Sequence, residues 1–469
     1  MSPPAKSSEL APHVAERLHV KVPWDVIGER VRRFEIHLQG TEVELVRGPV
    51  TVEGYGVRLF TPRGDHLAPG FHASTDLSAG GIAATVREAE SVGRFAEFPA
   101  RSVELPTQGP SASTASVVDQ KLWRDPLPTL EGYVHRMLEA FRGRSGVVPS
   151  FGSVKATLSE ESIANSAGAN VAFASTYIEL EIAVKASGGP EGPAPGEFWV
   201  NESFRRLEPD KLAGSVDAWC RYATDVRRAR APPSGSLAVV LPSDVLSGIL
   251  LPVLGSRFSG AARLRKIAPE VGTPVGPERL TVRDDGTHPW SVGSAPYDDE
   301  GTVQSRRSLI ENGVVTGHLY DALYAAALGT RSTGNAVRTA VGPSRMLRFA
   351  HAAAPGLSTL VVGPGDGGST DELVAAAQDG VYVAQLGWAS PDPISSAFGG
   401  EIRIGYRIRG GKLAEPVRGG TVGGVVLAPP QAPSLFANLA AIGSRTELSD
   451  ALASPPMLVR PLTVAGATG

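Results

Sequence analysis

The sequence is poor in the residues that form disulfides or cysteine-rich metal sites. Its 469 residues include one cysteine, Cys220, so neither an intrachain disulfide nor a cysteine-rich zinc module can form. The segment around Cys220 is amphipathic, which favours a buried, inert thiol over a reactive one. Small disulfide-stapled folds and zinc-finger classes are therefore excluded.

Long apolar segments are also missing. The longest run, from Val245 to Val253, includes Ser247 and Gly248 and is far too short to span a membrane. The first twenty residues are polar and contain no apolar stretch of signal-peptide length. We therefore expect a cytoplasmic protein without a membrane partner.

Neither sign of charge dominates the sequence. It has 45 basic and 48 acidic residues and a net charge of -3, so no broad basic field is present to attract nucleic acid. Hydrophobic residues make up 42% of the chain, which is typical of a globular protein. Because the chain is too long for one ordinary hydrophobic core, we expect two domains and no nucleic-acid partner.

Signatures of common hydrolase and nucleotide sites are missing as well. None of the nine histidines is followed by glutamate, so the chain has no HExxH or HExxxH helix. It also lacks a GxSxG elbow and a GxxxxGK[ST] phosphate loop. The glycines at 363–368 precede Ser369-Thr370-Asp371-Glu372, which is typical of a helix N-cap.

The first half of the sequence reads as an antiparallel sheet with helices. Alternating segments over 34–61 carry glycines that are expected to form turns, at positions 40, 48, 54 and 64. Helical spacing predicts helices over 82–98, 129–142 and onward from 209, and alternation predicts strands over 152–158 and 170–185. An α+β fold is expected for this half.

The composition changes at Pro232-Pro233. Short Val-rich segments separated by glycine turns follow, which indicates a mainly β domain. We therefore predict an N-terminal α+β domain over 1–231, with a polar leader over 1–20, and a C-terminal β-rich domain over 232–469.

Two acidic groups are the most suggestive polar features of the second half. Asp284-Asp285 and Asp298-Asp299-Glu300 lie close together in sequence, and clustered carboxylates can bind a cation or act in acid–base chemistry. Acidic residues beside glycine also form turns through their own side chains. The pattern favours this structural role.

A hairpin and a polar loop follow the acidic groups. Asn312-Gly313 joins two apolar segments, a strong hairpin signal. The loop over 331–338 is rich in donors, and Asn335 and Arg338 are suited to hold a peptide backbone or carboxylate. The alternative is a surface loop that satisfies its own backbone.

Taken together, these segments resemble the TldD/PmbA family. The resemblance lies in DDEG, LIENGVVTGHLYD and STGNAVR, in that order, with GVRLFTPRGDHLAPGFHASTDL and an NSxG-like turn before them. The segment SSAFGGEIRIGYRIRGGKLAEPVRGGTVGG is similar to the family's C-terminal ending. The resemblance implies a two-domain α+β protomer whose second half is a curved, barrel-like β structure.

Within that family, TldD carries a HExxxH zinc motif and a C-terminal cysteine ligand, whereas TldE (PmbA) lacks them. Here Gly248 to Arg257 corresponds to the zinc helix, with Pro252 and Val253 where His and Glu would stand. The segment Ile394 to Gly399 has no cysteine. The resemblance therefore implies no metal ligand, no cofactor and no catalytic residue in this chain, and zinc in a partner.

The leading hypothesis is a metal-free subunit of a TldD/TldE-type metallopeptidase. Its TldD-like HExxxH partner would hydrolyse peptides or peptide-like natural-product precursors. The alternative is a metal-free homodimer that binds peptides or acts as a scaffold without hydrolysis. The residues expected to contact substrate, from their place in the densest motif block, are Arg307, Tyr320, Asn335 and Arg338.

Overall fold

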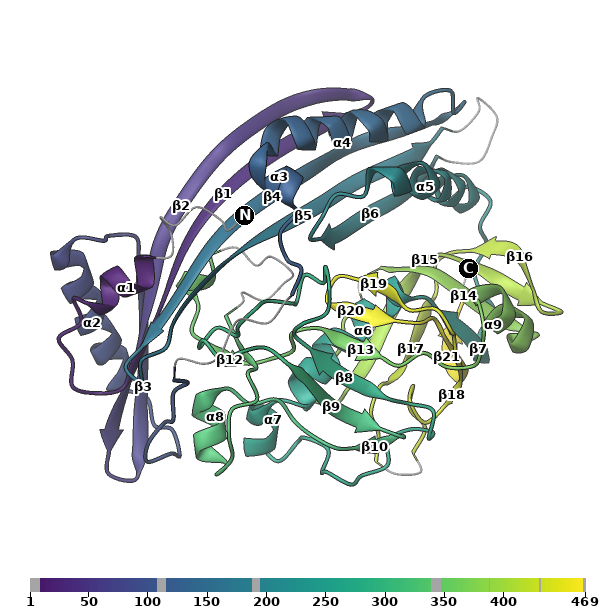
Figure 1. Ribbon diagram of the computed structural model, residues 1–469. Coiled ribbons are helices and arrows are strands. Elements are labelled where there is room, and N and C mark those ends of the chain that lie inside the picture. The colour runs from purple at the N-terminus through teal and green to yellow at the C-terminus, as the bar shows by residue number, and fades with distance from the viewer. Residues whose placement is uncertain are drawn as a thin grey trace.

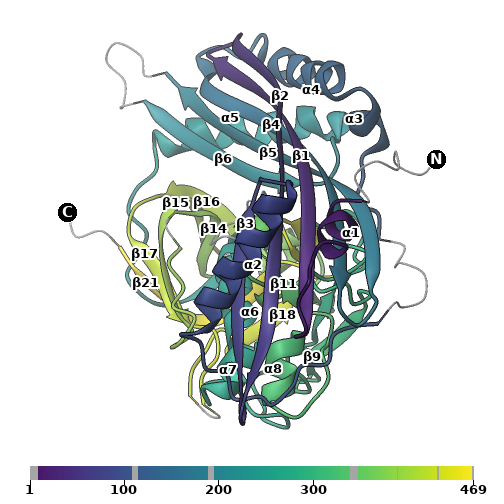
Figure 2. The same cartoon turned by 90° about the vertical axis from the view of Figure 1, so that its left-hand side faces the viewer.

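The computed structural model describes residues 9–107, 115–187, 195–338, 347–387, 389–429 and 432–466. Its first half is built on a strongly curved six-stranded antiparallel sheet with the order β3-β2-β1-β4-β5-β6. The strands are β1 (Trp24–Gln39), β2 (Glu42–Arg63), β3 (His66–Ser74), β4 (Val147–Asn165), β5 (Asn170–Ala186) and β6 (Gly196–Phe204). Figures 1 and 2 show this sheet arching over the second half of the chain.

Helices cover the sheet at two places. At one end lie α1 (Leu10–Ala15) and α2 (Ala79–Gly93), and toward the other lie α3 (Gln120–Arg124), α4 (Pro126–Phe141), the 3-10 turn η1 (Pro209–Lys211) and α5 (Leu212–Val226). The apolar stripes of α4 and α5 bury Met137 and Trp219 against the sheet, as their spacing predicts. Leu10, Ala11 and Val14 are buried, so the expected polar leader is wrong over this helix. Residues 1–8 lie outside the described part.

Two expected glycine turns are absent from the sheet. The chain turns at Gly40 and Gly64, as predicted, but Gly48 and Gly54 lie inside β2, which is a single 22-residue strand. Gly54 is needed for a different reason, because a Cβ there would lie 2.4 Å from the ring of Phe349. Sequence alternation alone does not reveal this close approach of a residue almost 300 positions away.

The second half contains a closed five-stranded barrel. β14 pairs with β7, β7 with β21, β21 with β17, β17 with β15, and β15 returns to β14. The strands of this sheet are β7 (Gly235–Leu241), β14 (Gly380–Gly387), β15 (Ala397–Arg409), β16 (Lys412–Val417), β17 (Thr421–Val425), β18 (Leu439–Ile442) and β21 (Met457–Ala465). The expected α+β class with a barrel-like second half is confirmed. Helix α6 (Ser243–Arg257) buries Leu246, Leu250 and Leu254 in the hydrophobic core of the second half. Helix α9 (Thr370–Ala377) begins at the predicted N-cap, where Ser369 forms a capping box with Glu372.

A second, smaller sheet carries the motif block and has the order β10-β9-β8-β13-β20-β19. Its strands are β8 (Val282–Asp285), β9 (Arg306–Glu311), β10 (Val314–Val315), β13 (Leu360–Val362), β19 (Glu447–Ser449) and β20 (Leu452–Ser454). Beside it lie α7 (Gly260–Leu264), α8 (Ala322–Ala327), the short pair β11 (Ala336–Val337) and β12 (Ala354–Pro355), and the 3-10 turn η2 (Arg348–Ala350). The Asn312-Gly313 hairpin forms as predicted, with φ values of 50° and 76°.

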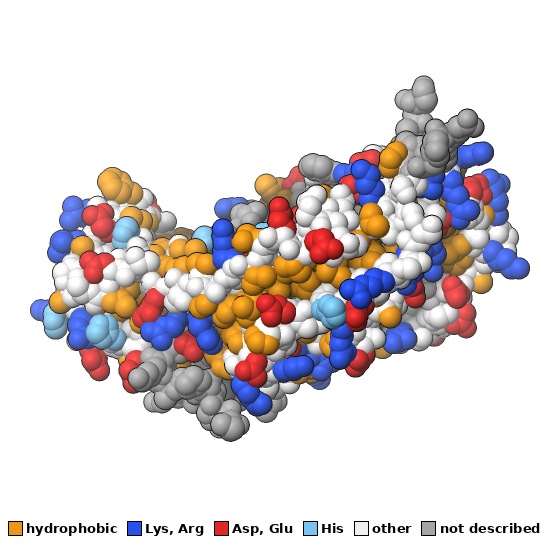
Figure 3. Space-filling model, turned by 90° about the horizontal axis from the view of Figure 1, so that it is seen from above, with side chains coloured by type: hydrophobic (Ala, Val, Ile, Leu, Met, Phe, Trp, Pro, Cys, Tyr) orange, Lys and Arg blue, Asp and Glu red, His pale blue; other side chains and the backbone are white. Residues whose placement is uncertain are grey.

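The start of β2 forms an exposed edge of the large sheet. β3 pairs only with residues from Tyr55 onward, and within the described ranges no other strand pairs with the outer edge of β2 before that point. Val43, Leu45 and Val50 are each more than 40% exposed there. Figure 3 shows the molecule from above, and hydrophobic side chains gather along the middle of the face seen there. No helix in the described residues has the length and apolar character to cross a membrane.

Candidate functional site

Three of the four expected substrate residues meet at Thr333. Arg307 Nε donates to the Thr333 carbonyl at 2.8 Å, and the Thr333 hydroxyl donates to Asn335 Oδ1 at 2.7 Å. The backbone N–H of Tyr320 donates to the same hydroxyl at 2.7 Å. The loop that begins at Arg331 is therefore fixed by its own motif residues.

Asn335 in turn holds a buried carboxylate. Its Nδ2 donates to Asp284 Oδ2 at 2.6 Å and to the Gly356 carbonyl at 3.1 Å. Asp284 also accepts from the Ser358 N–H and hydroxyl, each at 2.8 Å. Burial raises the pKa of Asp284 to about 6, against the opposing effect of these hydrogen bonds.

Arg338 lies in a cluster of buried charges between the large sheet and the second half. We call this cluster the interdomain ion cluster; it comprises Asp25, Glu29, Arg58, Glu161, Asp299, Glu300, Arg338 and Arg348. Arg338 pairs with Asp25 of β1 and donates to the His351 carbonyl at 2.9 Å. Arg58 of β2 pairs with both Asp25 and Glu300.

The rest of the interdomain ion cluster is centred on Arg348. Its guanidinium joins Glu161 of β4 to Asp299 of the second half. Glu29 lies beside them, and burial together with the charge of Glu161 raises its pKa to about 8. Since breaking a buried ion pair costs ~3–5 kcal/mol, these contacts fix how the sheet sits on the second half.

The four expected substrate residues thus have different surroundings. Asn335 and Arg338 are at most 1% exposed and bond to the protein, whereas Arg307 and Tyr320 are partly exposed. Substrate contact by any of them stays a prediction. All five acidic residues of the two groups are buried and accept internal hydrogen bonds, which supports their structural interpretation.

The end of α6 meets the loop that precedes β15. The guanidinium of Arg257 donates through Nη1 to the Ile394 carbonyl. Its Nε is buried and has no hydrogen-bond partner among the residues that the structure describes, and burial lowers the pKa of Arg257. One turn earlier, Val253 is buried in the barrel core and Pro252 is exposed.

Ser396, in the same loop, has an unusual backbone. Its φ is +65°, a region that non-glycine residues adopt rarely, and its side chain is fully buried. The hydroxyl has no hydrogen-bond partner in the described structure. The helix thus contributes a cation to this contact, and the loop carries a buried hydroxyl two residues after Ile394.

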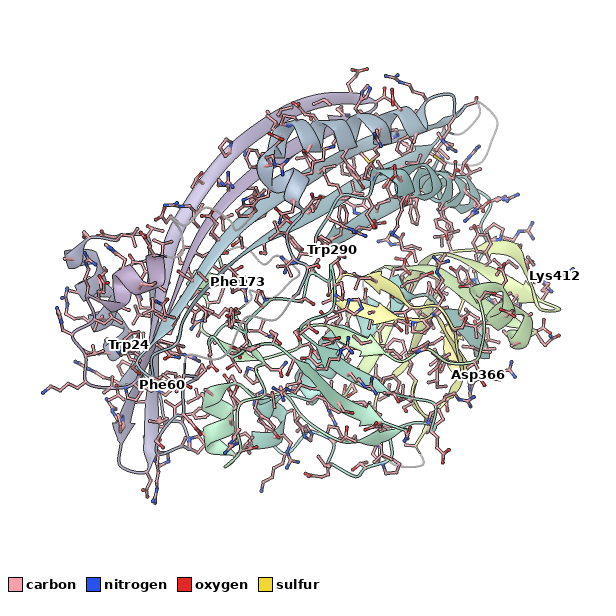
Figure 4. All side chains as sticks on the ribbon, in the orientation of Figure 1. Trp24, Phe60, Phe173, Trp290, Asp366 and Lys412 are labelled. Carbon is pink, nitrogen blue, oxygen red and sulfur yellow. The ribbon has the colours of Figure 1, made fainter. Side chains whose placement is uncertain are left out.

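Two adjoining clefts open where the large sheet meets the second half. The larger, of about 550 Å³, lies between β6 and α5 on one side and α6, β14 and β19 on the other. The smaller, of about 470 Å³, shares Tyr133 and Arg206 with it and includes Trp290. Figure 4 shows Trp290 at this junction, beneath the sheet. Arg206 stacks over its ring at 4.6 Å.

Two family models match this chain. Residues 120–228 match the PmbA/TldA metallopeptidase central domain, and residues 234–466 match the PmbA/TldA metallopeptidase C-terminal domain. The chain belongs to the PmbA/TldD family. The predicted division at 231/232 falls between the two matches and stays a prediction.

Solved structures of PmbA/TldD-like proteins share the fold. TldE from Thermococcus kodakarensis has a TM-score of 0.77 at 17% identity, with 98% of this chain and 99% of that chain covered. A proposed modulator of DNA gyrase from Bacteroides thetaiotaomicron has a TM-score of 0.78 at 18% identity, with 98% of both chains covered. At these identities the likeness shows the fold alone.

Curated relatives match over shorter lengths. The metalloprotease TldD homologue of Haemophilus influenzae is 28% identical over 213 residues, which cover 45% of this chain and 42% of the relative. A metalloprotease of Methanothermobacter thermautotrophicus is 28% identical over 287 residues, covering 60% of this chain and 61% of the relative. The matches thus span about half the length of these relatives.

The residues at the expected zinc position do not fit that metal. Proline and valine side chains carry no donor atom, and the guanidinium of Arg257 has no lone pair and repels a cation. Within the described ranges, no group of three or more His, Cys, Asp or Glu side chains is placed to hold a metal ion.

Several polar residues of these regions escape notice in the sequence. Glu202 and Asp244 line the larger cleft but come from β6 and α6, which no local motif connects. Arg257 carries a signal in retrospect, because it stands where the second histidine of HExxxH would be. Ser396 is conspicuous only through its backbone conformation.

Proposed function

We propose that this chain is the metal-free, TldE-like subunit of a cytoplasmic TldD/TldE-type metallopeptidase, with zinc and hydrolysis supplied by a HExxxH partner. The contact between Arg257 and Ile394 carries the proposal. It joins the helix and loop in which the family resemblance expects metal ligands, and it does so through a cation and a carbonyl. The names of the curated relatives support peptide hydrolysis as the reaction of the complex.

In this proposal, the chain supplies a fixed wall for the substrate. The interdomain ion cluster holds the large sheet against the second half, so the clefts between them keep their shape. Arg307 and Tyr320 are partly exposed and would contact the peptide directly, through a guanidinium and a ring. Asn335 and Arg338 would act indirectly, because their hydrogen bonds to the protein fix the loop over 331–338.

We assign partner pairing to the exposed edge of β2. A long strand with unpaired backbone groups and apolar side chains is a strong site for pairing with another chain. Val43→Lys should weaken co-purification with the partner, whereas Leu413→Lys, equally exposed on β16, should not. Equal co-purification of both variants would contradict this assignment.

Zinc content and peptidase activity of the chain, alone and co-expressed with a HExxxH homologue, test the proposed function. We expect the chain alone to be inactive with negligible zinc, and the complex to be active with zinc. Replacing the glutamate of the partner's HExxxH motif is the control and should abolish activity. Activity or tightly bound zinc in the lone chain would overturn the proposal. An inactive homodimer that forms no complex would support a peptide-binding scaffold instead.

A further inference from the structure

The larger cleft has walls of two kinds. Aromatic side chains of the sheet side and of β14 line much of it, namely Tyr133, Phe198, Trp199, Trp219, Tyr222 and Tyr382. Carboxylates project from both sides, with Glu202 on β6, Asp244 in the first turn of α6, and Glu447 and Asp450 on or beside β19. Segments more than 300 positions apart in the sequence, from Tyr133 to Asp450, therefore converge on one volume.

The negative charge of the cleft is not balanced by the protein. Of the nearby cations, Arg206 and Lys211 are engaged by Glu208, at 2.9 and 2.6 Å. Among the described residues, neither Glu202 nor Asp244 forms an ion pair. An excess of carboxylates therefore faces the cleft.

The carboxylates lie within reach of a ligand. Glu202 and Asp244 are both solvent-exposed, and both line the cleft between the sheet and the second half. Partial dehydration between the cleft walls and mutual repulsion raise the pKa of Glu202 to about 7, and partial dehydration raises the pKa of Asp244 to about 6. A bound cation would relieve this repulsion.

The aromatic walls favour an organic cation. Ammonium and guanidinium groups are attracted to the faces of Tyr and Trp rings and donate charge-assisted hydrogen bonds to carboxylates. The described part of the chain places no three potential ligand side chains together for a metal ion. A volume of about 550 Å³ admits a long basic side chain.

We propose that this cleft binds the ammonium or guanidinium group of a basic residue in the peptide substrate, with Glu202 and Asp244 as its counter-charges. The peptide nature of the ligand rests on the proposed function. Recognition of the cation belongs to this chain alone and needs no partner. The substrate class is thereby narrowed to peptides with a lysine or arginine.

Calorimetric titration of the full chain, without a partner, tests the proposal. The probes are N-acetyl-Ala-Lys-Ala-amide and the same peptide with norleucine, which has the length of lysine without its charge. The lysine peptide should bind about tenfold more tightly, as a charge-assisted contact with the cleft carboxylates implies. Glu202→Gln and Asp244→Asn should each weaken its binding about fivefold. Glu311→Gln, an exposed carboxylate outside the cleft, is the control.

Equal binding of the two peptides by the unaltered chain, or no binding of either, would overturn the proposal without any variant. Unchanged affinity in Glu202→Gln and Asp244→Asn, with melting temperatures showing that both fold, would also overturn it. Preference for lysine in a chain that never supports hydrolysis with a HExxxH partner would refute the proposed function and leave the cleft assignment standing. Hydrolysis by the complex without any preference for lysine would refute the cleft assignment and leave the proposed function standing.

Discussion

The guanidinium of Arg257 donates a hydrogen bond to the backbone carbonyl of Ile394, and this contact joins the last turn of α6 to the loop before β15. Because Ser396 in that loop adopts φ +65°, the loop is held in a conformation that its sequence alone disfavours. The contact lies at the place where the family resemblance expects a metal.

Replacing Arg257 should loosen this loop. Arg257→Ala removes the hydrogen bond to Ile394, so we expect a loss of ~1 kcal/mol in the free energy of unfolding and faster hydrogen exchange over 390–396. Lys412→Ala, an exposed cation on β16, serves as the control. Mass-spectrometric hydrogen exchange measures the effect, and unchanged exchange in the loop would show that Arg257 does not hold it.

Asn335 should matter for stability whether or not it contacts substrate. Asn335→Ala leaves the buried Asp284 without one of its donors, so the free energy of unfolding should fall by ~1–3 kcal/mol. Asn170→Ala, at an exposed position in β5, should change it little. Denaturant titration measures both; a fully stable Asn335→Ala variant would contradict the structural role.

Gly56 tests the packing of the sheet against the second half. A Cβ at this position would lie 2.4 Å from the Phe349 carbonyl oxygen, so Gly56→Ala should destabilise the protein by ~1–3 kcal/mol. Gly132→Ala, in an exposed position of α4 with open space around it, should stabilise it by ~0.5–1 kcal/mol. Thermal melting of the pair should give shifts of opposite sign. Shifts of equal sign would mean that η2 does not pack on β2 as described.

The buried carboxyl of Glu29 should make stability fall as the pH rises. Its pKa is about 8 in the folded chain, above its ordinary value, so the fold holds a proton that the unfolded chain releases. The stabilisation is full below the ordinary pKa and is lost as the pH rises through 8. Between pH 5.5 and 8.5, the melting temperature of Glu29→Gln should therefore fall less than that of the unaltered protein.

Asp321, with its pKa raised to about 8 by burial and by Glu300, titrates in the same direction and remains in the variant. The slope of melting temperature against pH should thus decrease rather than vanish. Glu311→Gln, exposed on β9, should keep the slope of the unaltered protein. An unchanged slope in Glu29→Gln would mean that Glu29 is ionised in the fold.

Local features of the fold follow from the sequence, because their causes lie within a few residues. The apolar stripes of α4 and α5, the Asn312-Gly313 hairpin and the Ser369 cap are all of this kind. Gly54 shows where prediction from the local sequence fails. Its role depends on Phe349, which arrives from another part of the chain, so a turn was the natural but wrong expectation.

The candidate sites depend on even longer separations. Arg58 and Glu300 meet across 242 positions, and no periodicity connects them. The sequence also does not reveal which residues of the motif block are buried. Arg338 and Asn335 look like accessible donors in the sequence but lie inside the protein. Charged residues of this kind are rarely buried unless they are paired, and their partners are visible only in the fold.

The number of zinc ions in the purified complex tests the central claim most directly. Native mass spectrometry of the co-expressed pair should find about one zinc per heterodimer, and none on the chain released from it, because Pro252, Val253 and Arg257 offer no ligand. Two zinc ions per heterodimer, or one retained by this chain alone, would contradict its assignment as the metal-free subunit.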